Sequence, residues 1–248
     1  ALGRTFSRAP KLLAPLLDDV ISLLTRLLVQ RAHRALAQAA AESLLVLVRS
    51  AGASFSQQTW ASICAELKSC FVAGVADLYV MPPAADGDAT SPLIREVSAK
   101  VTAEAPTNIA PHELQALLLS TVHQLLQSMY PSMKLSDVEG LLACMHGMYD
   151  KAHRRIVSAL GGEEPRLSPG EILEASHVKV EAVSYYLQSL FHLYGPLTKP
   201  PPPERPPPKL GTEGHVLLVA ARAEFRLISF CLHVLRDYLS LQKLSLDA

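Results

Sequence analysis

The stretch "SAGASFSQQTWASICAELKSCF", residues 50–71, decides the fold, because it joins two apolar-periodic segments through a short turn. We expect Gly52 to end the first helix in a left-handed conformation, which glycine adopts without steric cost. Ser56 is expected to cap the next helix, which we predict to extend to about Leu78. Its apolar stripe comprises Trp60, Ile63, Cys64, Leu67, Phe71, Val75 and Leu78. We interpret Trp60, the only tryptophan, as a core anchor between helical hairpins rather than a surface that stacks a ligand.

The same pattern of helix, short break and helix extends along the chain in both directions. Before the opening stretch we predict a helix over 11–30, with a start nearer Ala14, and another over 33–50. The first carries apolar residues at steps of three and four, namely Leu13, Leu16, Leu17, Val20, Leu23, Leu24, Leu27 and Leu28. Later helices are predicted over 111–130, stopping before Pro131, and over 137–160, 171–194 and 212–242.

Two later helices carry recognisable start signals. Ser136 with Glu139 has the spacing of a capping box, in which each residue satisfies a free backbone N–H near the helix start. Ser168 with Glu171 repeats it, with proline at the first helical position. We expect the helices to end at Gly161 and Gly162 and at Gly195 and Pro196, in that order.

These elements predict an all-α chain organised as a HEAT/armadillo-like α-solenoid of stacked helical hairpins, in preference to a single bundle. The helix pairs recur with an approximate period near 40 residues, without a sharp consensus. We expect helical repeats over 11–80, a loop or linker over 81–110, repeats over 111–195, a proline-rich spacer over 196–211 and a terminal helix over 212–242.

Composition narrows the possible functions. The 23 Lys and Arg residues balance 23 Asp and Glu residues, so we expect no nucleic-acid partner. Cys64, Cys70, Cys144 and Cys231 lack metal-site spacing and are expected to be reduced core thiols in a cytosolic protein. No apolar run has the roughly 18 residues that a membrane-spanning helix needs. The chain has no initiator methionine, so we interpret it as part of a longer protein.

The sequence offers one candidate group for metal binding. His146, Asp150 and His153 have the spacing i, i+4 and i+7, which places them near one face of a helix. No fourth ligand is identifiable, so we favour a solvated helix face. No nucleophile is paired with a base and no phosphate-binding glycine loop is present. We therefore expect no enzyme activity, cofactor or metal.

Two basic groups could contact anionic lipid or an acidic partner. They are Arg26, Arg31 and Arg34 near the first interhelical turn, and Lys151, Arg154 and Arg155. Solvated hairpin ends explain both groups equally well. Pro200, Pro203 and Arg205 match the P-x-x-P-x-R pattern of an SH3-type ligand, although a stiff proline spacer is the favoured interpretation. The Tyr185, Tyr186, Phe191 and Tyr194 set is expected to belong to the core.

The segment "LAQAAAESLLVLVRSAGASFSQQTWASICAELKSCF" resembles the C-terminal helical repeats of the large brefeldin-A-inhibited (BIG-type) Arf guanine-nucleotide exchange factors. The resemblance rests on a leucine-rich helix, Gly52, the Phe55-Ser56 step and Trp60. A second match, "VEAVSYYLQSLFHLY", is similar to a later helix of that family. Its signature residues are Glu181, Ser184, Leu187, Leu190, Phe191 and Tyr194. The chain departs from the family in "VSALGGEEPRLSPGE" and in the insertion "KPPPPERPPPK".

The resemblance implies a cytoplasmic protein, peripheral at Golgi or trans-Golgi membranes, whose full length activates Arf GTPases. Nucleotide exchange belongs to a separate catalytic domain, so no catalytic residue is carried over to this chain. The repeats would act in membrane recruitment, autoinhibition, dimerisation, or binding of activated small GTPases of the Arf or Rab family. The alternative is a HEAT-like adaptor in a trafficking complex without exchange activity.

Overall fold

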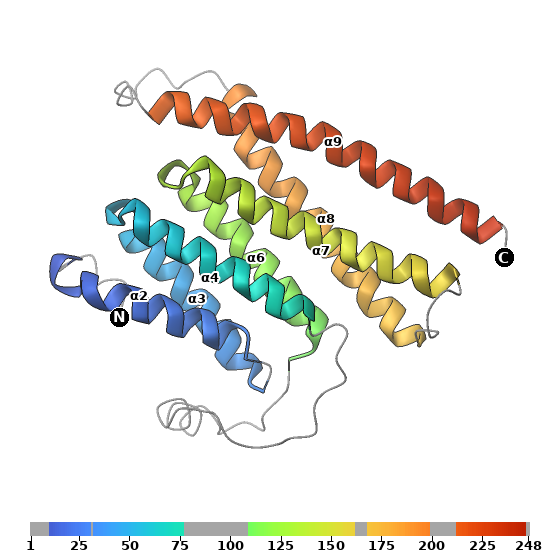
Figure 1. Cartoon of the computed structure of the whole chain (residues 1–248), viewed down its shortest axis with the longest axis horizontal. Helices are drawn as coiled ribbons and strands as arrows, with labels where there is room; N and C mark the ends of the chain where they lie inside the picture. The colour runs from blue at the N-terminus through green and yellow to red at the C-terminus, as the bar shows by residue number, and fades with distance from the viewer. Residues whose placement is uncertain (1–9, 31, 77–108, 162–167, 199–211, 247–248) are drawn as a thin grey trace. The chain divides into compact units, whose positions relative to one another are not determined.

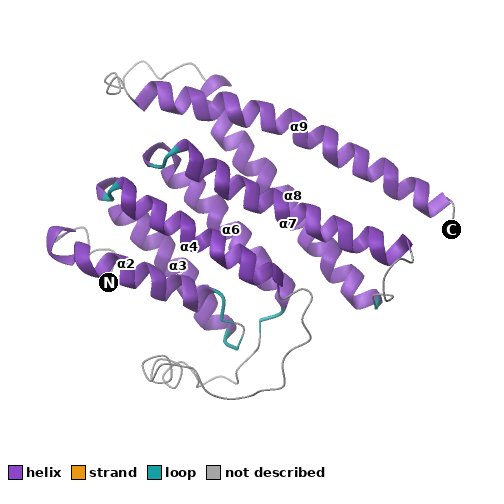
Figure 2. Cartoon of the chain, in the orientation of Figure 1, coloured by secondary structure: helices purple, strands orange, loops and turns teal. Residues whose placement is uncertain are grey.

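The computed structural model describes residues 10–30, 32–76, 109–161, 168–198 and 212–246. The chain is all-helical over these residues, and they contain no strand (Figure 2). It divides into two compact units, Ala1–Val122 and His123–Ala248. The boundary falls inside helix α6, Pro111–Met129. Each unit is described by itself.

The first unit is built on helix α2, Pro10–Leu28, which packs against both α3, Arg34–Ala51, and α4, Gln57–Ala76. These helices are coloured blue to cyan in Figure 1. The prediction that α2 starts nearer Ala14 is wrong, because the helix begins at Pro10 and continues through Pro15. Its buried apolar side chains are Leu17, Ile21, Leu24 and Leu28. Leu16 and Leu23 of the predicted stripe are exposed, because the four-three-four spacing from Leu17 follows the inner face more closely.

The turn between α3 and α4 differs from the prediction at Gly52. Its backbone is right-handed, with φ −58° and ψ −32°, so the expected left-handed ending is wrong. The chain instead tightens into a 3₁₀ turn, Gly52–Ser54, in which the Phe55 N–H donates to the Gly52 carbonyl at 3.1 Å. The cap at Ser56 is confirmed, since the Thr59 N–H donates to its hydroxyl oxygen at 3.1 Å.

Trp60 is fully buried, which confirms its place in the core. Its ring centroid lies 5.6 Å from that of Phe55. Phe55 precedes the cap and Trp60 is the fourth helical residue, so the two rings form a hydrophobic staple that fixes how the chain enters α4. The rest of the described stripe, Ile63, Cys64, Leu67 and Phe71, is buried as predicted. Leu78 lies outside the described residues.

The second unit consists of the end of α6 and three long helices: α7, Leu135–Gly161; α8, Pro169–Thr198; and α9, Thr212–Leu246. α8 packs extensively on both α7 and α9, and α7 also contacts α9 (Figure 1). α6 ends at Met129 and Pro131 lies in a 3₁₀ turn, as expected from the restricted backbone before proline.

Of the two capping boxes predicted in this unit, one is confirmed and one is wrong. Ser168 and Glu171 form the predicted box: the Glu171 N–H donates to the Ser168 hydroxyl at 3.3 Å, and the Ser168 N–H donates to the Glu171 carboxylate at 2.8 Å. The box at Ser136 is wrong, because α7 already begins at Leu135. Backbone N–H groups of the first turn donate instead to the Lys134 carbonyl. α8 also continues through Gly195 and Pro196 to Thr198, beyond the predicted end.

Helix α9 has two different faces. The inner face buries Val219, Ala220, Ala223, Phe230 and Asp237. The outer face, as we call it below, exposes Leu217, Leu218, Phe225, Ile228, Leu232, Leu235 and Tyr238. α9 is therefore apolar on both sides, and the polar residues of its inner face form the candidate site described next.

The prediction of core thiols is correct for Cys64 and Cys70, which are buried and form no disulfide. Burial, followed by the nearby Glu66 carboxylate, raises the pKa of Cys70 to about 11, so its thiol stays protonated. Cys144 is partly buried, whereas Cys231 is exposed on α9, so the prediction of a core position is wrong for Cys231.

Candidate functional site

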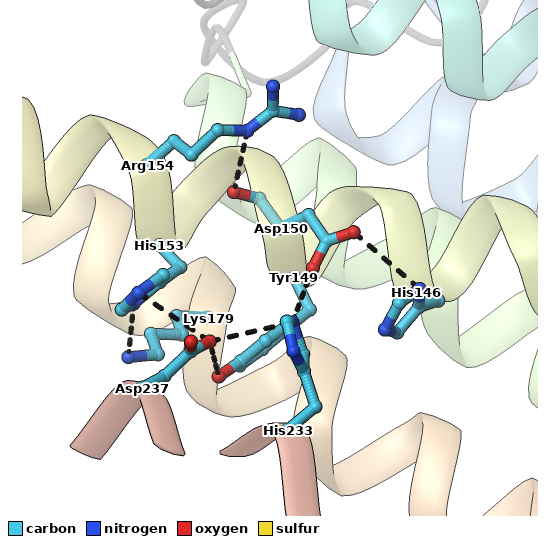
Figure 3. Close-up of polar contacts among 8 residues, drawn as sticks. All are labelled: His146, Tyr149, Asp150, His153, Arg154, Lys179, His233 and Asp237. Atoms are coloured by element: carbon cyan, nitrogen blue, oxygen red, sulfur yellow. Dashed lines mark hydrogen bonds and ion pairs between the residues drawn. The ribbon is translucent and has the colours of Figure 1, made fainter. Parts of the chain in front are cut away.

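A cluster of polar side chains lies where α7, α8 and α9 meet (Figure 3). We call it the polar cluster; its members are His146, Tyr149, Asp150 and His153 on α7, Lys179 on α8, and His233 and Asp237 on α9. On α7 the members recur at steps of three and four, which places them along one side of the helix. His233 and Asp237 are one turn apart on α9 and face the same way.

Asp237 is the centre of the cluster. The Tyr149 hydroxyl donates to Asp237 Oδ2 at 2.7 Å. The Nε2 atoms of His153 and His233 lie 3.5 and 3.6 Å from the same oxygen. A carboxylate that is almost fully buried needs such partners, because burial without them would cost several kcal/mol. Burial and the bond to Asp237 raise the pKa of Tyr149, so this hydroxyl acts as a hydrogen-bond donor and not as a nucleophile.

Lys179 determines which ring nitrogen of His153 carries the proton. Its Nζ lies 2.9 Å from His153 Nδ1, so the ammonium donates to an unprotonated ring nitrogen. The proton of the neutral imidazole is then on Nε2, which faces Asp237. Burial, and then the Lys179 charge, lower the pKa of His153, in agreement with this neutral form. Lys179 Nζ also lies 5.5 Å from the centre of the Tyr149 ring, within range of a cation–π contact.

Asp150 links the cluster to a pocket. His233 Nε2 lies 3.1 Å from Asp150 Oδ1, and His146 Nδ1 lies 3.6 Å from Asp150 Oδ2. His146 and His233 line an open pocket of about 380 Å³ together with Glu139, Tyr186, Arg222, Phe225, Arg226, Ser229 and Phe230. Burial lowers the pKa of His146, an effect that Asp150 partly offsets. The pocket therefore combines imidazoles, aromatic rings and two arginines.

The polar cluster joins three helices through charged and hydrogen-bonded contacts. Its role in this arrangement is to hold these helices together. Each buried charge has partners on another helix, so removal of one member would leave the others unsatisfied. The arrangement holds the inner face of α9 against α7 and α8, and thereby directs its outer face away from them.

One Ser–His pair escaped the sequence analysis. Ser189 Oγ lies 2.9 Å from His123 Nδ1, and both side chains are buried. The Ser189 hydroxyl donates to the Tyr185 carbonyl at 2.8 Å, so its proton is directed away from the imidazole. A catalytic dyad needs the reverse arrangement, with the hydroxyl donating to the base. The pair therefore stabilises the contact between α6 and α8.

Two residues of the predicted basic groups form ion pairs with carboxylates. Arg34 forms an ion pair with Glu113 at 3.0 Å, and Arg155 lies 3.4 Å from Glu171 with only 12% of its side chain exposed. Arg155 is thus poorly placed for lipid contact. Arg26 and Arg154 are exposed, and Arg154 Nε donates to the backbone carbonyl of Asp150 at 3.3 Å. Lys151 is partly exposed.

Four other predicted residues, Arg31, Pro200, Pro203 and Arg205, lie outside the described part of the chain. Among the signature residues of α8, Glu181, Leu187 and Tyr194 are partly exposed. Phe191 is exposed, so its predicted core position is wrong, whereas Tyr186 is buried. Leu187 lines an apolar groove of about 330 Å³ with Phe230, Cys231, Val234, Leu235 and Tyr238.

The favoured interpretation of His146, Asp150 and His153 as a solvated helix face is wrong, because these residues contact α8 and α9. The structure replaces His153 in that group with His233, because His153 turns to Asp237 and Lys179. Tyr149, Lys179, His233 and Asp237 were missed. Two of them could have been found from the sequence, because His233 and Asp237 have the same i, i+4 spacing as His146 and Asp150 on α7. Their meeting with α7 depends on helix packing that one sequence does not reveal.

Within the described residues, no helix has the length and apolarity to cross a bilayer. Comparison with known proteins gives one family: the model of the BIG2 C-terminal domain matches residues 113–247, which include the whole polar cluster. No curated protein and no solved structure matches the chain.

Proposed function

The chain belongs to the BIG2 C-terminal domain family, and we propose that it is a regulatory and recruitment scaffold of a large Arf guanine-nucleotide exchange factor in Golgi vesicular trafficking. The proposal is supported by the resemblance at Gly52, Phe55, Ser56 and Trp60 and along α8. Exchange chemistry would lie in another domain of that protein.

The proposed architecture is a HEAT/armadillo-like α-solenoid. In the second unit, helices pack mainly on their neighbours in the chain, α7 on α8 and α8 on α9, whereas in the first unit α2 packs on both α3 and α4. Nearest-neighbour packing, as in the second unit, is typical of stacked helical repeats.

The outer face of α9 is the observation that carries the proposed function. Phe225 is 72% exposed, Leu232 63% and Ile228 58%. Leu218, Phe225 and Leu232 follow each other at intervals of seven residues, with Ile228 between the last two and Leu235 three residues beyond them, so they form one continuous stripe. Exposed Arg222, Glu224 and Arg236 flank it. A contiguous apolar stripe with a polar rim is typical of a protein-binding surface.

The groove at Leu187 extends this surface. It lies between α8 and α9 and is bordered by Leu235 and Tyr238 of the outer face. A partner that lays an apolar patch on α9 could insert a side chain into the groove, as anchor residues do at protein interfaces. We infer that this partner is an activated small GTPase of the Arf or Rab family, and that its binding recruits the exchange factor to Golgi membranes.

The experiment is a pull-down of the full chain with Arf-family and Rab-family GTPases, each loaded with GTP analogue or GDP. We expect a GTP-dependent complex that Phe225→Asp and Leu232→Asp both abolish, because each places a charge in an apolar contact. Val72→Asp is the matched control, since Val72 is an equally exposed apolar residue on α4. Circular dichroism checks that every variant is folded.

Flotation with anionic liposomes distinguishes a direct lipid role. Binding that depends on Arg26 or Arg154, two exposed members of the basic groups that form no ion pair with a carboxylate in the described part of the chain, would indicate lipid recruitment without the outer face of α9. The proposal fails for this chain if neither GTPase binds at micromolar concentration. A GTP-independent protein complex on the outer face would favour the HEAT-like adaptor.

A further inference from the structure

We propose that His146, Asp150 and His233 bind a divalent transition-metal ion of the zinc class, at the wall of the pocket between α7, α8 and α9. Each residue offers one ligand atom, and the three atoms lie within 4.8 Å of one another. His146 and Asp150 come from one turn of α7, and His233 comes from α9 (Figure 3). The inference does not depend on the proposed GTPase binding.

The distances fit tetrahedral coordination. Zinc binds histidine nitrogen at about 2.0–2.1 Å, which places neighbouring ligands of a tetrahedral ion about 3.4 Å apart. His146 Nδ1 lies 3.6 Å from Asp150 Oδ2, and His233 Nε2 lies 3.1 Å from Asp150 Oδ1. The two distances end on different oxygens of Asp150, so a rotation of its carboxylate is needed for one oxygen to share an ion with both imidazoles. One ligand atom from each of the three residues already lies within 4.8 Å of the others.

The ligand types and the charge around them also fit. Two imidazoles and one carboxylate are a common zinc ligand set. Asp237, whose Oδ2 is 3.6 Å from His233 Nε2, supplies a second negative charge beside the ion. The positive charges near the site that would repel the ion include Arg226, which lines the same pocket, and Lys179. Arg226 lies 3.9 Å from Glu139, and Lys179 is directed to His153.

The site is accessible from solvent. The side chains of His146, Asp150 and His233 are 35%, 33% and 40% exposed, and the two histidines line the pocket. An ion can enter there, and water can supply the fourth ligand. His153 is not a ligand, because Lys179 donates to its Nδ1 and its Nε2 faces Asp237.

Coordination would cross-link α7 to α9, because one histidine comes from each helix. An ion that binds the folded unit and not the unfolded chain stabilises it by mass action. The predicted consequence is a zinc-dependent rise in the melting temperature of the chain.

The experiment uses the full chain after removal of metal with a chelator. Calorimetry with Zn²⁺ should show one ion per chain, and Co²⁺ should give the visible bands of a tetrahedral nitrogen–oxygen site. Asp150→Asn and His233→Gln, which nearly preserve side-chain shape, should each weaken binding by more than the roughly 10–100-fold that loss of an outer partner costs. Each should also abolish the zinc-dependent shift in melting temperature.

Two control variants make the outcome decisive. Cys231→Ser removes the exposed thiol two residues from His233, and His177→Gln removes an exposed histidine on α8; both should bind as the parent chain does. Thiolate bands that disappear in Cys231→Ser would place the ion on cysteine and overturn the proposal. Absence of saturable binding, or equal binding by folded Asp150→Asn, would also overturn it.

Discussion

Trp60 carries two opposing contributions to stability. Its indole N–H is buried with no hydrogen-bond partner among the described residues, which costs about 1–3 kcal/mol. Its ring is fully buried and packs on Phe55, and truncation of such a ring costs about 3–5 kcal/mol. The measured truncation cost already contains the penalty of the unpaired N–H, so burial of the ring dominates. A stabilising role is sufficient to explain the residue.

We therefore predict that Trp60→Ala lowers the free energy of unfolding by about 3–5 kcal/mol. Urea unfolding followed by circular dichroism measures this, since the variant has no tryptophan fluorescence. Val72→Ala, at an exposed position on the same helix, should change stability by less than about 0.5 kcal/mol. If Trp60→Ala unfolded like the parent chain but lost a partner, Trp60 would belong to a binding surface.

At the scale of elements, local signals predicted helix starts well where the sequence supplied the cap itself. Ser56 and Ser168 cap as predicted because each directs its hydroxyl to a backbone N–H three residues ahead. The prediction at Ser136 is wrong because α7 starts at Leu135, two residues before the predicted start, and N–H groups of its first turn donate to the Lys134 carbonyl. The end predicted at Gly195 and Pro196 is wrong by a few residues, because α8 continues to Thr198, and the position of a helix end is the part that local signals predict least well.

The contact between α6 and α8 predicts a dependence of stability on pH. His123 is buried beside Ser189, Tyr185 and His192 of α8. Burial, and then the charge of His192, lower the pKa of His123 below its usual value of 6.5. The folded state thus binds fewer protons than the unfolded state as pH falls below about 6.5, and its stability decreases until the folded-state pKa is passed.

The measurement is the melting temperature of the chain and of His123→Gln between about pH 7.5 and pH 5. Glutamine can keep a hydrogen bond to Ser189 but does not titrate. We expect the decrease in melting temperature on acidification to be smaller in the variant. An identical decrease in both proteins would show that His123 is protonated as easily in the folded state as in the unfolded state.

At the scale of the molecule, the sequence predicted the all-α class because apolar residues recur at helical steps throughout the described chain. The same periodicity gave a wrong prediction for Phe191, which was expected in the core and is exposed in the structure. It could not predict the polar cluster, since that cluster depends on α9 lying against α7 across more than 80 residues of chain. A single sequence contains periodicity but not the pairing of distant helices.

The two faces of α9 connect the site to the proposed function. On the inner face, His233 and Asp237 hold the helix to α7 through Asp150 and Tyr149. On the outer face, the apolar stripe remains available to a partner. The polar cluster would thus determine which side of α9 faces the partner, and the stripe would determine what binds.

Amide hydrogen exchange of the full chain tests this account most directly. The chain is compared alone, with GDP-loaded and with GTP-analogue-loaded Arf-family and Rab-family GTPases. The account predicts slower exchange in peptides that cover residues 217–238 of α9 and the Leu187 region of α8, only with the GTP-analogue form of a GTPase. Equal exchange in all states, or slower exchange confined to other helices, would contradict it.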